Sequence, residues 1–124
     1  FHFAFLGDES QWAAEAAECS GEQDAFWDYY NYLFSHQNGE NQGAFSIENL
    51  KSFAAEMDLD TKDFNECLDS GRYTALVQNM SNIARQLGVQ STPTFAINGQ
   101  GVVGAKDFSE LASIIDSFLT PTEP

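Results

Sequence analysis

Basic residues are scarce in this chain of 124 residues: five Lys and Arg stand against nineteen Asp and Glu, for a formal net charge of −14. Such an acidic surface repels phosphate backbones and anionic lipid, so we expect no nucleic-acid partner. Long apolar runs are also lacking, and none approaches the roughly 20 residues of a membrane-spanning helix. The opening run FHFAFLG lacks the basic flank and cleavage site of a signal peptide. We therefore expect no membrane span.

Motifs for metal, phosphate and hydrolytic chemistry are missing as well. The two His and two Cys are widely scattered, and neither a glycine-rich phosphate loop nor a G-x-S-x-G nucleophile motif occurs. We expect no metal site and no bound cofactor. Apolar residues make up 43% of the chain and aromatic residues 14%, which is typical of a protein with a packed core.

Apolar residues at helical spacing predict six helices. In the first of these, Glu15, Glu18 and Glu22 are expected to mark the solvated face, and in the second a broad aromatic face is expected to lie deep between other helices. Ser46, Asp60 and Asp107 are the expected capping residues. The expected ranges are about 11–20, 24–36, 46–57, 60–70, 73–87 and 108–119.

Three short segments predict strands. Phe1 to Leu6 is a continuous apolar run, typical of a strand buried on both faces. TFAI and VVG flank the turn NGQG, which predicts a hairpin. Because a lone strand cannot bury itself, we expect residues 1–6 to join the hairpin in one sheet, with the helices beside it.

The segment GVQSTPTFAING places Thr92 and Pro93 between a long helix and a strand. Proline cannot donate to a sheet ladder, so Pro93 is either an ordinary loop residue or a cis-proline held beside a reactive site. The sequence of this segment alone does not decide between these two interpretations of Pro93.

Three stretches resemble the DsbA-like branch of the thioredoxin superfamily, the thiol-disulfide oxidoreductases: AAEAAECSGEQDAFWDYYNYLF, ENLKSFAAEMDLDTKDFNECLDSGRY and RQLGVQSTPTFAINGQGVVGA. The resemblance covers nearly the whole chain and implies an α/β, thioredoxin-like fold with a helical insertion, lacking the first strand and the helix that carries Cys-x-x-Cys. The implied parts are a partial sheet and C-terminal helix (1–7 and 89–120), a helical insertion with its connecting helix (10–88), and a tail (121–124).

The resemblance also implies a function, disulfide exchange with protein substrates and a redox partner protein. Ser91, Thr92 and Pro93 would form the cis-proline loop that binds substrate peptide, and the Thr92 hydroxyl would tune a facing thiolate. The catalytic Cys-x-x-Cys would precede Phe1, so this chain is expected to be an inactive fragment of its parent enzyme. The gap in the sheet would be filled by pairing of residues 1–6 with 94–97, or by a second copy in a homodimer or strand exchange.

Cys19 and Cys67 lie on apolar helix stripes, and neither has a second Cys three residues away. They are either buried free thiols or a structural disulfide. The family context is extracytoplasmic, periplasmic or secreted, and together with the even cysteine count it favours a disulfide.

Two other functions remain open. One is a non-catalytic thioredoxin-fold module that binds peptides or acts as a chaperone, without redox chemistry. The other is a relative of kappa-class glutathione transferases or chromene carboxylate isomerases, which would need a serine at the missing site and a glutathione pocket. The helical-domain cysteines and the stretch AAECSGEQDAFW argue against this last function.

Overall fold

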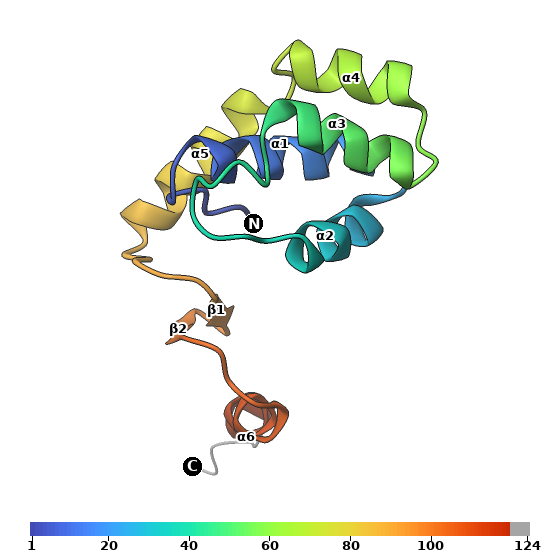
Figure 1. Cartoon of the computed structure of the whole chain (residues 1–124). Coiled ribbons are helices and arrows are strands. Elements are labelled where there is room, and N and C mark those ends of the chain that lie inside the picture. The colour runs from blue at the N-terminus through green and yellow to red at the C-terminus, as the bar shows by residue number, and fades with distance from the viewer. Residues whose placement is uncertain (120–124) are drawn as a thin grey trace. The chain divides into compact units, whose positions relative to one another are not determined.

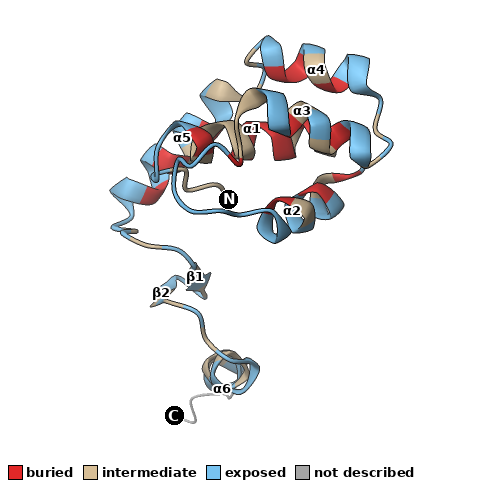
Figure 2. Cartoon of the chain, viewed as in Figure 1, coloured by how far each residue is buried: buried red, intermediate tan, exposed pale blue. Residues whose placement is uncertain are grey.

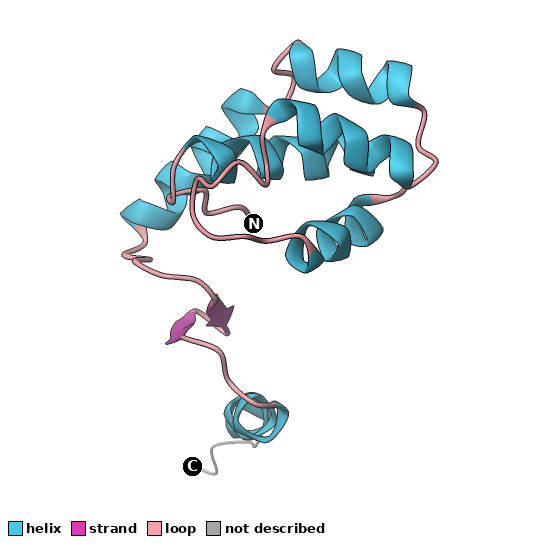
Figure 3. Cartoon of the chain, in the orientation of Figure 1, coloured by secondary structure: helices cyan, strands magenta, loops and turns pink. Residues whose placement is uncertain are grey.

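Helices dominate the computed structural model, which describes residues 1–119 and contains a single small sheet in that range (Figures 1 and 3). The predicted tail, 121–124, lies outside the described residues. The order of helices and strands matches the prediction from α1 onward. The elements are α1 (Asp8–Gly21), α2 (Phe26–Ser35), α3 (Ile47–Glu56), α4 (Thr61–Asp69), α5 (Thr74–Gln86), β1 (Thr94–Ile97), β2 (Gln100–Val103) and α6 (Phe108–Leu119).

The chain divides into two units, Phe1–Ala84 and Arg85–Pro124. In the first unit α1 packs against α2, α3 and α4, and α3 also contacts α2 and α4. The core is centred on Tyr29, Leu50 and Phe64, each with no exposed surface. Buried residues gather on these helices (Figure 2). Burial of each such side chain contributes about 2 kcal/mol to folding, so the helical unit has a core of its own.

Side-chain caps start two of these helices where the sequence predicts them. The Ser46 hydroxyl accepts a hydrogen bond from the Asn49 backbone N–H at 3.3 Å. The Asp60 carboxylate accepts from the backbone N–H groups of Lys62 and Asp63, at 3.0 and 3.1 Å. These bonds satisfy N–H groups that have no partner within the helix. Both predicted caps are confirmed.

The predicted solvated face of α1 is wrong at Glu15. This carboxylate is 5% exposed and accepts hydrogen bonds from the Gln11 side-chain amide and from the Thr74 hydroxyl, each at 2.7 Å. The start of α5 thus supplies a polar partner that helical periodicity alone does not reveal. Burial is tolerated because the carboxylate oxygens are hydrogen-bonded.

The predicted strand at residues 1–6 is also wrong, because the described sheet contains β1 and β2 alone. The segment lies against α1 and α5 instead. The Ala4 backbone N–H donates to the Ser81 hydroxyl at 3.0 Å, and His2 Nε2 lies 2.8 Å from a Glu18 oxygen. Within the first unit, side chains thus take the place of a ladder partner for this segment.

In the second unit β1 and β2 form an antiparallel hairpin, in which Thr94 pairs with Val103 and Ile97 with Gln100. Helix α6 follows, and its predicted capping box is confirmed: the Glu110 N–H donates to Asp107 at 2.8 Å and the Asp107 N–H to Glu110 at 3.3 Å. Along α6 the apolar residues Leu111, Ile114 and Phe118 are half-buried, whereas Phe108 and Ile115 are exposed.

Candidate functional site

The loop that links α5 to β1 carries the residues predicted to bind peptide. Gly88 follows the end of α5 with a positive φ of 81°, which favours glycine and turns the chain out of the helix. The Thr94 hydroxyl donates to the Ser91 carbonyl at 2.7 Å, which closes a short turn around Thr92 and Pro93. The Thr92–Pro93 peptide bond is cis. The structure thus places Ser91, Thr92 and Pro93 together in one compact turn.

The hairpin holds this turn at its other end. The Gly104 N–H donates to the Pro93 carbonyl at 2.9 Å, one step beyond the pairing of Thr94 with Val103. Thr92 and Pro93 are exposed, whereas Ser91 and Thr94 are half-buried. Among the described residues β1 pairs with β2 on one edge only, so its other edge presents backbone N–H and C=O groups. An extended peptide can add to such an edge as a further strand.

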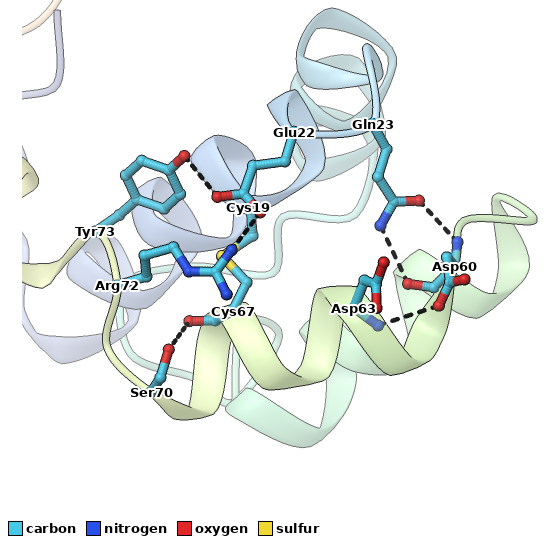
Figure 4. Close-up of polar contacts among 9 residues, drawn as sticks. All are labelled: Cys19, Glu22, Gln23, Asp60, Asp63, Cys67, Ser70, Arg72 and Tyr73. Atoms are coloured by element: carbon cyan, nitrogen blue, oxygen red, sulfur yellow. Dashed lines mark hydrogen bonds and ion pairs between the residues drawn. A yellow bond between two sulfur atoms is a disulfide. The ribbon is translucent and has the colours of Figure 1, made fainter.

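Cys19 and Cys67 lie in the helical unit, where they form a disulfide between α1 and α4 (Figure 4). Their Cα atoms are 5.8 Å apart and each residue is 1% exposed. The described residues, which include both cysteines of the chain, hold no free thiol. This disulfide is therefore shielded from exchange and acts as a cross-link.

Polar side chains cluster around the disulfide (Figure 4). The Glu22 carboxylate accepts hydrogen bonds from the Arg72 guanidinium and, at 2.8 Å, from the Tyr73 hydroxyl. Arg72 first and Tyr73 second hold the pKa of Glu22 below its usual value, and the same carboxylate raises the pKa of Tyr73. These contacts tie the end of α1 to the segment before α5.

The second tie in this cluster is reciprocal. The Gln23 side-chain amide donates to the Asp60 carbonyl at 3.1 Å, and the Asp60 backbone N–H donates to the Gln23 side-chain oxygen at 2.7 Å. The residue that caps α4 is thus also joined to the end of α1. The hydrogen-bonding groups of this cluster bond to one another, so the cluster has a structural role and links α1 to the neighbouring segments.

The sequence-based prediction for the aromatic side of α2 is wrong. Trp27 is 70% and Phe34 58% exposed, whereas the prediction placed this broad face deep between helices. Tyr29 and Leu33 form the buried side of α2. Residues 26, 30 and 34 are spaced four apart and form one apolar stripe, and residues 29 and 33 form another. This spacing in the sequence could have indicated that the helix has two apolar stripes.

A family model described as "Thioredoxin" matches residues 1–117. The chain belongs to the DsbA-like thioredoxin family. Similar proteins include a Bacillus anthracis protein named "Probable disulfide bond formation protein D", 29% identical over 122 residues, and a Bacillus subtilis protein named "Disulfide bond formation protein D", 26% identical over 118 residues. These matches cover 95% and 93% of this chain.

A second group of relatives carries a different name. A Salinispora arenicola protein named "Na(+)/H(+) antiporter NhaA 1" is 34% identical over 113 residues, which are 91% of this chain and 17% of that protein. This chain spans about half the length of the disulfide-formation relatives, at 55% for the Bacillus anthracis protein. No solved structure matches significantly. Within residues 1–119 no helix has the length and apolar character needed to cross a bilayer.

Proposed function

We propose that this chain carries the peptide-binding part of a DsbA-like thiol-disulfide oxidoreductase, in which Ser91, Thr92 and Pro93 dock a protein substrate beside a redox dithiol. The observation that carries the proposal is the exposed Thr92-Pro93 turn at the open edge of β1. Family membership supports it, since thioredoxin-family chains act on thiols of partner proteins. A thiol- or disulfide-containing protein and a redox partner protein are the proposed partners.

The exchange itself needs a thiolate. In the reducing direction one thiolate attacks a substrate disulfide, forming a mixed disulfide and releasing one substrate thiolate, which takes up a proton. The second thiol of the dithiol, as thiolate, then attacks the mixed disulfide and releases the other substrate thiol. The substrate is reduced and the dithiol is oxidised; the oxidising direction runs in reverse. No bound cofactor takes part.

The dithiol would be a Cys-x-x-Cys outside residues 1–124, because Cys19 and Cys67 are already joined to each other. The chain alone is therefore expected to bind peptide without exchanging disulfides. In the parent protein the Thr92 hydroxyl would face the thiolate and tune its stability. We also propose an extracytoplasmic location, where a structural disulfide such as Cys19–Cys67 persists.

Peptide binding at this loop is testable with an isotope-labelled sample of the whole chain. A cysteine-free extended peptide is titrated in, and backbone amide shifts are followed by NMR. We expect the shifts to concentrate at residues 91–97 and Pro93→Ala to weaken binding about tenfold, whereas the exposed Ser113→Ala variant in α6 binds as the wild type does. Shifts confined to other regions, or equal binding by Pro93→Ala, would contradict the proposal.

A non-catalytic peptide-binding or chaperone module is the second candidate. The observation that favours it is the lack of a Cys-x-x-Cys within residues 1–124. Such a module would use the same loop, so peptide binding does not separate the two candidates. The two candidates are separated by whether the parent protein contains a dithiol.

The open edge of β1 also supports the proposal that two copies of this chain pair by strand addition or exchange. Sedimentation velocity over a range of concentrations tests this directly. We expect a dimer. We also expect Ala96→Pro, in the middle of β1, to convert this dimer to a monomer. A monomer at every concentration would refute the pairing.

A further inference from the structure

Helix α2 has a second apolar side, of which only Phe26 packs against the core of the helical unit. Its members are Phe26, Trp27, Tyr30 and Phe34, and we refer to them as the aromatic face. Trp27 is 70%, Phe34 58% and Tyr30 38% exposed. Tyr29 and Leu33, which anchor the helix in the core, are buried. Tyr29 and Leu33 therefore anchor the helix without help from Trp27, Tyr30 or Phe34.

The rings of the aromatic face contact one another and form one continuous surface. Ring centroids are 5.1 Å apart for Phe26 and Trp27, 5.4 Å for Trp27 and Tyr30, and 4.6 Å for Tyr30 and Phe34. These are distances at which aromatic pairs attract. Single exposed apolar residues need no explanation, whereas large contiguous exposed patches are typical of interaction sites.

Charge defines what kind of partner fits this surface. Asp24 lies just before α2 and Asp28 in its first turn, and both are exposed. Neither is part of an ion pair among residues 1–119, where the pairs involve other carboxylates. Lys and Arg are attracted both to these carboxylates and to the faces of Trp and Tyr rings. The surface therefore favours a cationic partner with apolar side chains.

We propose that the aromatic face is a docking site for a cationic polypeptide segment, one in which Leu or aromatic anchors alternate with Lys or Arg. The anchors would pack on Trp27 and Phe34, and the cations would lie against Asp28 and the ring of Tyr30. A second copy that used the same face would bring its own Asp24 and Asp28 against those of the first copy, and these like charges would repel. The inference does not depend on the proposed role of the Thr92-Pro93 loop.

The test uses the whole chain and three capped peptides in which Leu alternates with Lys, Gln or Glu. We expect the Leu-Lys peptide to shift the amides of α2 in NMR spectra, to bind more weakly as salt is raised, and to bind more tightly than the other two. Trp27→Ala is expected to weaken binding about tenfold or more, because exposed Trp residues dominate such interfaces. Asp28→Asn should weaken it less, and Phe108→Ala, which removes a Phe that is 88% exposed in the other unit, should not change it.

Three results would overturn the inference. Equal binding of all three peptides would show that charge plays no part. Protection of Trp27 from acrylamide quenching in the free chain would show that the face is already covered by this chain. A dimer that Trp27→Ala converts to monomer would show that a second copy is the occupant. Because Trp27 is mostly exposed, Trp27→Ala should keep the helical circular dichroism of the wild type, and Tyr30→Ala provides a second variant if it does not.

Discussion

Removal of the Cys19–Cys67 disulfide should destabilise the helical unit strongly. The two cysteines are separated by 48 residues, and both are 1% exposed. In the chain-entropy treatment, a cross-link over a loop of this length lowers the entropy of the unfolded chain by an amount worth about 4 kcal/mol at 25 °C. Replacing both residues with Ala restores that entropy. The expected loss is a large part of the roughly 5–15 kcal/mol that stabilises a typical domain.

The assay is urea unfolding of the oxidised wild type and of the Cys19→Ala/Cys67→Ala double variant, followed by tryptophan fluorescence. Trp12 packs against the core that contains both cysteines, so its emission reports on this unit. Wild type treated with a reductant is the matched control, and it should unfold like the double variant. A difference below about 1 kcal/mol would refute the reasoning. Two alkylatable thiols in unreduced protein would refute the cross-link itself.

Three further predictions concern polar contacts of the helical unit. Asp60→Ala should cost about 1 kcal/mol of unfolding free energy by removing the cap of α4. Glu9→Ala, which removes a buried carboxylate that binds backbone N–H groups in the loop before α3, should cost about 2 kcal/mol or more. Because Arg72 and Tyr73 lower the pKa of folded Glu22, its stabilising contribution is present above the unfolded pKa and lost as pH falls through the folded value. In the Glu22→Gln variant the free energy of unfolding should therefore fall less steeply than in the wild type as the pH is lowered.

Each of these predictions has its own check by denaturant unfolding. Asp60→Ser retains a capping oxygen and should be close to wild type, so an equal loss in both variants would argue against the cap. Glu48→Gln, an exposed carboxylate in the first turn of α3, is the control for Glu9, and the same loss in both would show a general charge effect. For Glu22, parallel acid profiles of variant and wild type between pH 2 and pH 5 would contradict the assigned pKa shift.

Local signals in the sequence were sufficient for most of the helices and for the hairpin. Asp60 and Asp107 supply carboxylates to the N–H groups of the residues that follow them, so their effect depends on a few neighbouring positions. The same holds for Asn98 and Gly99, whose positive φ values of 49° and 81° make the two-residue turn between β1 and β2. The turn around Pro93 could likewise be placed from its position before β1.

Features that depend on distant partners were predicted less well. An apolar run becomes a strand only if another strand pairs with it, and residues 1–6 find side chains such as Ser81 instead. Glu15 is buried because Thr74, fifty-nine residues away in sequence, donates to it. The aromatic face of α2 was predicted as core because periodicity shows which residues share a side of a helix, not whether anything covers that side.

The central claim is that the Thr92-Pro93 loop works beside a redox dithiol in the parent protein. Its most direct test is a disulfide-exchange assay on the protein translated from a reading frame that includes the codons preceding Phe1, with a peptide disulfide as substrate. We predict a Cys-x-x-Cys in that protein, exchange that requires its first cysteine, and a reduction potential that Thr92→Val changes. A parent protein without this dithiol, or one that binds the peptide and exchanges no disulfide, would contradict the claim and favour a non-catalytic binding module.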